Sequence, residues 1–197
     1  QDELALRSHQ RAVAAMDAGR FKAEIAPVPL PQRKGPPVMF ETDEGPRRDT
    51  SIEALAGLKP AFRQGGTVTA GNAPGITDGA AALVLARRSF ADARGLKVRA
   101  RVRGYAQGRV KPQEIFTAPV YAVRNLCAKI GCEPGDFDLV ELNEAFAAQA
   151  VSNMRELGLD AGRVNVNGGA IAIGHPIGAS GARVLTTLLY ALAGRDA

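Results

Sequence analysis

A single histidine, His175, stands among five glycines in residues 165–183 and is followed directly by Pro176. Glycine lets the backbone come close to a ligand, and proline keeps the preceding residue out of helical dihedral angles. An imidazole held in such a loop can take up and return a proton near neutral pH. The pattern therefore makes His175 a candidate for acid–base chemistry, with a histidine that only satisfies local structure as the alternative.

A second polar group, Asn143, lies where a predicted strand over residues 137–143 meets a predicted helix over residues 144–157. Ligands of α/β proteins gather beyond the carboxyl ends of strands. An asparagine at such a junction can support a developing oxyanion, directly or through a water, or can cap the following helix. The next residue, Glu144, is interpreted as a carboxylate that stabilises a helix N-terminus, in preference to an acid or base.

The elements that position these residues can be predicted from periodicity and from helix end signals. Helices are expected over residues 2–18, 88–94, 118–130, 144–157 and 180–192, with a short helix capped by Thr50 or Ser51 and ending at Leu58. Strands are expected over residues 80–86, 97–108 and 137–143, extended chain over 24–30 and 164–167, and a surface loop over 31–48. Strands that alternate with helices predict an α/β layered fold in which helices cover a sheet.

Composition narrows the class of protein. The 197-residue chain is 46% hydrophobic and shows no secretory signal, and no apolar run approaches the roughly 20 residues that span a bilayer. The net charge of +5 is compatible with a nucleic acid or with a phosphate-bearing small molecule as the ligand. The arginines of residues 98–105 alternate, however, so we interpret them as one solvated face of a strand.

The two cysteines, Cys127 and Cys132, lie on a predicted helix and its exit loop. They lack a Cys-x-x-Cys spacing and companion ligands, so a zinc site is not expected. We interpret both as packing residues of a protein from a reducing compartment, with a nucleophilic role as the disfavoured alternative.

Four collinear motifs resemble those of the thiolase family, and the similarity extends in order over essentially the whole chain. The first two are Gln1-Asp-Glu-Leu-Ala-Leu-Arg-Ser-His-Gln-Arg-Ala and Gly66-Thr-Val-Thr-Ala-Gly-Asn-Ala-Pro-Gly-Ile-Thr-Asp-Gly-Ala-Ala-Ala. The last two are Asn143-Glu-Ala-Phe-Ala and Gly168-Gly-Ala-Ile-Ala-Ile-Gly-His-Pro-Ile-Gly-Ala-Ser-Gly-Ala-Arg. The resemblance implies the family's layered αβαβα fold with mixed sheets, present here only in part.

The resemblance also implies a division into domains. Residues 1–74 would be part of a loop domain that covers coenzyme A, and residues 75–97 the last strand and helix of the N-terminal domain. Residues 98–197 would be the C-terminal domain without its final strands. Because the chain opens inside a predicted helix and stops directly after another, it is expected to be a fragment of something larger.

In thiolases a cysteine takes an acyl group from one coenzyme A thioester and passes it to coenzyme A or to an acetyl-CoA carbanion. His175 matches the family's histidine that activates this cysteine and helps to stabilise the thioester oxyanion, and Asn143 matches the asparagine that anchors a water there. The implied substrate contacts are Arg47 for the adenosine phosphates, Phe62 and the loop of Ala73, Pro74 and Gly75 for the pantetheine arm, and Ile115 and Phe146 for the acyl group.

The sequence departs from the family pattern at positions that the resemblance assigns to substrate binding and to the reaction. Pro74 stands where many members have a serine, and proline supplies neither a hydroxyl nor a backbone N–H. Ala54 replaces a frequent serine near the nucleotide, and residues 115–118 depart from a Gly-rich form. The family's nucleophilic cysteine would precede the first residue and its acid–base cysteine would follow the last one. Neither Cys127 nor Cys132 matches them.

The resemblance therefore implies an acyltransferase in the intact protein and an inactive 197-residue chain on its own. The alternative is a non-catalytic thiolase-like protein that binds acyl-CoA. Coenzyme A and acyl-CoA are expected as substrates, without a permanently bound cofactor or a metal. A cytoplasmic homodimer or homotetramer is expected, without nucleic acid or membrane partners, while the direction of the reaction and the acyl chain length stay open.

Overall fold

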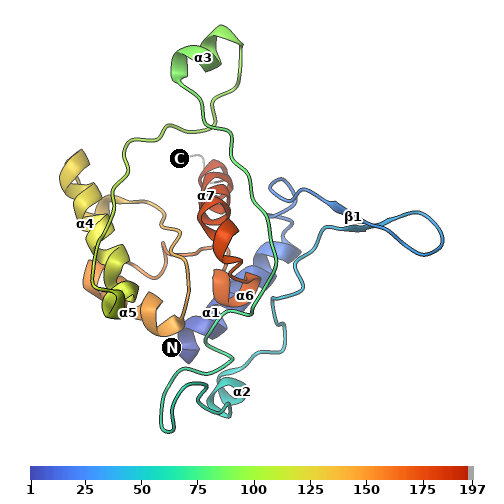
Figure 1. Ribbon diagram of the computed structural model, residues 1–197, viewed down its shortest axis with the longest axis vertical. Coiled ribbons are helices and arrows are strands. Elements are labelled where there is room, and N and C mark those ends of the chain that lie inside the picture. Colours follow the sequence, from blue (N-terminus) through green and yellow to red (C-terminus); the bar gives the residue numbers. More distant parts are fainter. Residues whose placement is uncertain (195–197) are drawn as a thin grey trace.

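A computed structural model describes residues 1–194 of the chain. Its elements are α1 Asp2–Asp17, β1 Val28–Leu30, β2 Val38–Phe40, α2 Ile52–Ala56, α3 Arg88–Ala93, η1 Pro112–Thr117, α4 Ala118–Ile130, η2 Pro134–Asp136, α5 Ala147–Leu157, α6 Ala170–Ile173 and α7 Ile177–Ala193. Figure 1 shows α1, α6 and α7 near the centre, the hairpin of β1 and β2 projecting from the body, and α3 standing apart from the other helices. Within residues 1–194, no helix is both long enough and apolar enough to cross a membrane.

The core lies where α1 and α6 pack together and α5 covers them. The buried cluster consists of Leu4, Ala5, Leu55, Ala147, Ala150, Met154, Val164 and Ile171. Its alanines let the helices approach closely, and each larger aliphatic side chain stabilises the fold by roughly 1.5–3 kcal/mol when fully buried. Gly168 has a φ of +85°, and a Cβ there would lie 2.7 Å from the carbonyl oxygen of Ser8. Glycine is therefore required where the loop before α6 crosses α1.

Predicted helix ends are confirmed where a specific cap forms. The Ser51 hydroxyl accepts a hydrogen bond from the N–H of Ala54 at 3.1 Å and opens α2. Gly131 and Gly158 adopt the left-handed conformation and end α4 and α5. The helices predicted over residues 2–18, 88–94 and 118–130 are confirmed to within one residue, and α2 ends at Ala56, before the predicted Leu58.

Two predicted helix starts are wrong. The helix α5 begins at Ala147 and not at residue 144, because Phe146 has an extended backbone with φ −154° and ψ 146°. The helix α7 begins at Ile177 and not at Ser180, because Pro176 has a φ of −67° that leads directly into a helix.

The strands predicted over residues 80–86 and 97–108 are wrong for the described chain. Neither segment forms a ladder, and the side chains of Val84 and Tyr105 are 97% and 75% exposed. An alternating pattern gives a strand its two faces, but a strand also needs a neighbour that exchanges backbone hydrogen bonds with it. Within residues 1–194 no segment pairs with either stretch.

The regular sheet of the described residues is the antiparallel pair of β1 and β2, in which Val28 lies opposite Phe40. Because β2 falls inside residues 31–48, the surface loop predicted there is wrong in part; the strand is exposed throughout, so no buried face marks it. The strand predicted over residues 137–143 is reduced to a parallel bridge between Val140 and Val164. This bridge places the segment of Asn143 beside the loop that leads to α6.

Candidate active site

Two glycines let residues 77–79 pack closely against the loop that carries His175. A Cβ added to Gly174 would lie 2.6 Å from Oγ1 of Thr77, and a Cβ added to Gly79 would lie 2.7 Å from Cγ of Pro176. The segment from Thr77 to Gly79 therefore runs along the backbone on either side of His175. Larger side chains at the two glycines would separate these segments.

The predicted loop of Ala73, Pro74 and Gly75 is held nearby by the preceding residue, Asn72. The Asn72 side chain is fully buried and bonds to the backbone of Thr67 and Thr69. The backbone carbonyl oxygen of Asn72 accepts from the N–H of Ala147 at 2.9 Å. Ala73 and Pro74 are half-buried, and Gly75 is exposed. The loop thus lies beside the start of α5.

Asn143 and His175, predicted from separate motifs, are brought together. Nδ2 of Asn143 lies 3.3 Å from Nε2 and 3.5 Å from Nδ1 of the His175 ring. Because these distances are nearly equal, the amide nitrogen lies against the ring and not in line with either nitrogen lone pair. Oδ1 of Asn143 is buried and has no hydrogen-bond partner among residues 1–194. The alternative prediction, in which Asn143 caps its helix, is wrong, because Phe146 occupies that position.

His175 is held from another side by Ser180, whose Oγ lies 2.6 Å from Nδ1 of the ring. Burial and then the positive charge of Arg183 lower the pKa of His175. The ring is therefore neutral at neutral pH and can accept a proton. The motifs do not single out Ser180 as a site residue, although its five-residue spacing from His175, behind a proline that opens a helix, is a signal that could have indicated it.

Three phenylalanines form a cluster of edge-to-face contacts. The ring of Phe146 lies 5.9 Å from that of Phe62 and 5.4 Å from that of Phe116, measured between centroids. Phe62 and Phe146 are predicted site residues, whereas Phe116 was missed although it follows the predicted Ile115. Ile115 is largely exposed, and so is Phe62. The cluster therefore forms an apolar wall that is open to solvent on one side.

Arg47 is not brought to the other candidate residues. Its side chain is exposed and makes no hydrogen bond or ion pair within residues 1–194, while its backbone N–H donates to Nδ1 of His9 at 3.1 Å. The backbone is thus fixed and the guanidinium can reach outward. Its contact with a phosphate stays a prediction.

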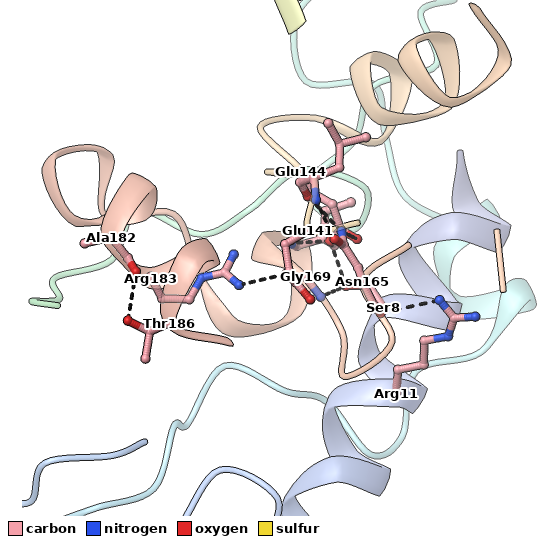
Figure 2. A network of polar contacts seen from close by, with 11 residues as sticks. Ser8, Arg11, Glu141, Glu144, Asn165, Gly169, Ala182, Arg183 and Thr186 are labelled. Carbon is pink, nitrogen blue, oxygen red and sulfur yellow. Dashed lines mark hydrogen bonds and ion pairs between the residues drawn. The ribbon is translucent and has the colours of Figure 1, made fainter. Parts of the chain in front are cut away.

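Behind the site, Glu144 joins three parts of the chain (Figure 2). Its side chain is 4% exposed, and its carboxylate accepts from Oγ of Ser8 at 2.7 Å, from Nδ2 of Asn165 at 2.8 Å and from the N–H of Ile171 at 3.1 Å. Ser8 in turn accepts from the N–H of Gly169 at 2.9 Å. Burial raises the pKa of Glu144, and the three hydrogen bonds oppose that rise.

The Glu144 carboxylate does stabilise a helix N-terminus, but not that of the helix which follows it in sequence. The bond to Ile171 fastens the first turn of α6, 27 residues further along the chain. Its bond to Ser8 spans 136 residues and ties the same carboxylate to α1. Because these partners are distant in sequence, the local pattern around Glu144 does not reveal them.

Two family descriptions match the sequence over nearly its whole length. "Thiolase, N-terminal domain" matches residues 1–89, and "Thiolase, C-terminal domain" matches residues 96–197. The chain belongs to the thiolase family. The resemblance expected from the four motifs is thereby confirmed, while the domain boundaries expected at residues 74 and 97 stay a prediction.

Named relatives agree with this thiolase assignment. The chain is 56% identical over 197 residues to the acetyl-CoA acetyltransferase of Pseudomonas aeruginosa and 53% identical over 196 residues to that of Escherichia coli. Each alignment covers 100% of the chain and 50% of the relative. The thiolase chain therefore spans about half the length of the curated relatives it matches.

Two solved structures share the fold. The acetyl-CoA acetyltransferase of Bacillus anthracis is similar with a TM-score of 0.96 and 46% identity, covering 100% of the thiolase chain and 50% of that structure. Human mitochondrial 3-ketoacyl-CoA thiolase is similar with a TM-score of 0.91 and 40% identity, covering 99% and 49%. The expected thiolase-like fold, present in part, is confirmed by these similarities.

The cysteines of the thiolase chain lie at the end of α4 and in the turn that follows it. Burial and the neighbouring Cys132 raise the pKa of Cys127 to about 11, so this thiol stays protonated at neutral pH. The part of the chain that the structure describes contains no group of three or more His, Cys, Asp or Glu placed to hold a metal ion.

A second buried carboxyl of the thiolase chain, Glu141, faces Arg183 with 3.4 Å between Oε2 and Nη1 (Figure 2). Burial raises the pKa of Glu141 from 4.5 to about 8, and the charge of Arg183 opposes the rise. Folding therefore takes up a proton between these two pH values. The free energy of unfolding is expected to fall as the pH rises through that window, because the unfolded chain releases the proton first.

Urea unfolding at about pH 5 and about pH 8 measures this effect. Glu141→Gln removes the titrating group, so the variant is expected to lose less stability than the parent between the two pH values. Glu156→Gln is the matched control at an exposed carboxyl and is expected to behave like the parent. Glu24, whose pKa burial raises to about 7, keeps a slope of the same sign in all three proteins. Equal slopes in the parent and Glu141→Gln would contradict the prediction.

Proposed function

We propose that this chain supplies the histidine and the asparagine of an acyltransferase that moves acyl groups between coenzyme A thioesters. The reaction is thiolytic cleavage of a 3-ketoacyl-CoA or condensation of two acetyl-CoA. The observation that carries the proposal is the 3.3 Å contact of Asn143 with His175, made by two motifs 32 residues apart. The name shared by the relatives, acetyl-CoA acetyltransferase, supports the same reaction class.

In the condensation direction of the proposed reaction, a cysteine outside this chain attacks the thioester carbonyl carbon of one acetyl-CoA. Nε2 of His175 takes the proton of the cysteine thiol, the sulfur bonds to the acyl carbon, and the bond to the sulfur of coenzyme A breaks. The proton then passes from His175 to the departing thiolate, which leaves as coenzyme A. A base outside this chain removes a proton from C2 of a second acetyl-CoA, and the resulting carbanion takes the acyl group from the cysteine. In thiolytic cleavage the steps run in reverse: the cysteine attacks the 3-keto carbon, the bond between C2 and C3 breaks, C2 is protonated so that acetyl-CoA leaves, and the thiol of coenzyme A takes the acyl group from the cysteine.

The thioester oxygen gains negative charge during each attack. The protonated Nε2 of His175 can donate to it, and so can a water held by Asn143. The buried Oδ1 of Asn143, which has no partner among residues 1–194, suits it to hold such a water. Each donor aimed at an oxyanion contributes about 10²–10³ in kcat.

Coenzyme A and acyl-CoA are proposed as the substrates, without a resident cofactor, in a cytoplasmic homodimer or homotetramer. The exposed guanidinium of Arg47 suits a phosphate. The wall of Phe62, Phe116 and Phe146 suits the pantetheine arm and the acyl group. Pro74 supplies no donor to the pantetheine arm, so that contact has to come from other groups.

The test is the cleavage of acetoacetyl-CoA by coenzyme A, followed through the loss of 3-ketoacyl-CoA absorbance. The full-length protein is expected to turn over. The 197-residue chain alone is expected to be inactive, because within residues 1–194 no hydrogen bond joins His175 to Cys127 or Cys132. Coenzyme A binding without turnover by the full-length protein would overturn the proposal and favour an acyl-CoA-binding protein. Cleavage by the 197-residue chain would overturn the placement of the nucleophile outside it.

A further inference from the structure

The contact between Ser180 and His175 is built into the first turn of α7. Pro176 precedes the helix, and Ser180 follows it by four residues, so that the serine hydroxyl can donate to the carbonyl of Pro176, as serines in helices commonly do. The observed distance from Oγ to that carbonyl oxygen is 3.0 Å. Ser180 is 5% exposed, so solvent competes little for its hydroxyl.

One hydroxyl hydrogen has to serve two short contacts. Oγ of Ser180 lies 3.0 Å from the carbonyl oxygen of Pro176 and 2.6 Å from Nδ1 of His175. If the hydrogen pointed to Nδ1, the hydroxyl and carbonyl oxygens would face each other as two acceptors. If it points to the carbonyl, the hydroxyl oxygen accepts from an N–H at Nδ1. Only this second arrangement makes both contacts hydrogen bonds.

No other described contact decides where the ring proton lies. The amide of Asn143 is nearly equidistant from the two ring nitrogens and therefore favours neither. Burial and the charge of Arg183 lower the pKa of His175, so the ring is neutral at neutral pH and one of its two tautomers has to be selected. Ser180 is therefore the residue that makes the selection.

We propose that Ser180 is a positioning residue that holds neutral His175 as the tautomer protonated at Nδ1, which leaves the lone pair of Nε2 free. The catalytic consequence rests on the proposed function. In that reaction Nε2 has to accept the proton of the cysteine thiol, and the other tautomer, which carries a proton there already, cannot do so. After proton transfer, the bond from Nδ1–H to Ser180 stays in place.

Nitrogen NMR of the full-length protein, with ¹⁵N-labelled histidine and at a pH where the rings are neutral, reads the tautomer directly. His9 is the internal reference, because its Nδ1 accepts from the backbone N–H of Arg47 at 3.1 Å and its proton must therefore lie at Nε2. The resonances of His9 and His175 are assigned by their loss in the variants His9→Gln and His175→Gln. His175 is expected to carry its proton at Nδ1, and His9 at Nε2. A proton at Nε2 of His175 would overturn the proposal, whether or not the protein shows acyl transfer.

Ser180→Ala tests whether Ser180 determines the tautomer of His175. The variant is expected to shift His175 toward the tautomer protonated at Nε2 and to lower kcat by about tenfold, with KM for acyl-CoA unchanged. Ser180→Thr keeps a hydroxyl and is expected to restore both. Thr186→Ala is the matched control, because it removes a hydroxyl that donates to the carbonyl of Ala182 at 2.9 Å in the same helix (Figure 2).

The outcomes separate the inference from the proposed function. An unchanged tautomer in a folded Ser180→Ala protein, or the same loss of kcat in Thr186→Ala, would overturn the role of Ser180. An inactive parent with the expected tautomer would overturn the proposed function alone. If Ser180→Ala does not fold, the tautomer of the parent and of Ser180→Thr still decides the inference.

Discussion

Replacement of His175 by alanine in the full-length protein is expected to lower kcat for acetoacetyl-CoA cleavage by about 10²–10⁴-fold, the usual contribution of one acid–base group. The loss is large because the same ring would take the proton of the nucleophile and stabilise the oxyanion. Thermal unfolding should change little, since the half-buried ring makes one close hydrogen bond, to Ser180. Initial rates and unfolding curves of parent and variant measure the two effects.

The second histidine of the chain gives the matched control. His9→Gln retains an acceptor for the backbone N–H of Arg47 and is expected to keep kcat near that of the parent. A His175→Ala protein with near-normal kcat would refute the role assigned to His175. Equal losses in the two variants would mean that activity follows the general state of the fold and not this ring.

Glu144→Ala is expected to reduce the free energy of unfolding by roughly 3–5 kcal/mol, because it leaves buried donors without an acceptor. The three groups that lose their partner are the Ser8 hydroxyl, the Asn165 amide and the N–H of Ile171. Since typical proteins are stable by only about 5–15 kcal/mol, the loss is a large part of the total. Urea unfolding, followed by circular dichroism, measures it.

Two further variants serve as controls for Glu144→Ala. Glu144→Gln keeps one carbonyl oxygen in place and should lose less stability than alanine does. Glu156→Ala removes an exposed carboxylate that pairs with Arg124 at 3.4 Å, and should change stability by less than about 1 kcal/mol. A Glu144→Ala protein as stable as Glu156→Ala would show that the buried network contributes little.

Helices were the part of the fold that the sequence predicted well, because a helix is held by bonds within one segment. The periodic apolar residues of α1, the serine cap of α2 and the glycine end of α4 are all local signals. Each can be recognised without knowing what the helix packs against. The same reasoning failed at the starts of α5 and α7, where Phe146 and Pro176 set the backbone before the helix.

Strands were predicted poorly for the opposite reason. Residues 97–108 alternate as a strand does, but alternation describes the two faces of a strand and says nothing about its neighbours. In the described chain this segment pairs with no strand; Gly104 and Gly108 lie against α4, and most of the segment's side chains are exposed. The short strand β2 was missed because it pairs with β1 without burying a face.

The residues of the candidate site were likewise predicted only in part. The motifs predicted that Asn143 and His175 belong together, and they lie 3.3 Å apart. Their supporting residues were missed. Ser180 is near in sequence, and its spacing from His175 could have revealed it. Ser8 lies 136 residues from Glu144, and only the packing of α1 against the site loops brings these two side chains together.

Asn143 and Glu144 are consecutive, so a single peptide unit separates a side chain that lies against the His175 ring from one that is fastened to α1. A displacement of α1 would therefore reach the amide of Asn143 almost directly. In the proposed reaction, substitutions on the buried face of α1 are therefore expected to alter the position of Asn143 from a helix whose side chains do not contact the His175 ring.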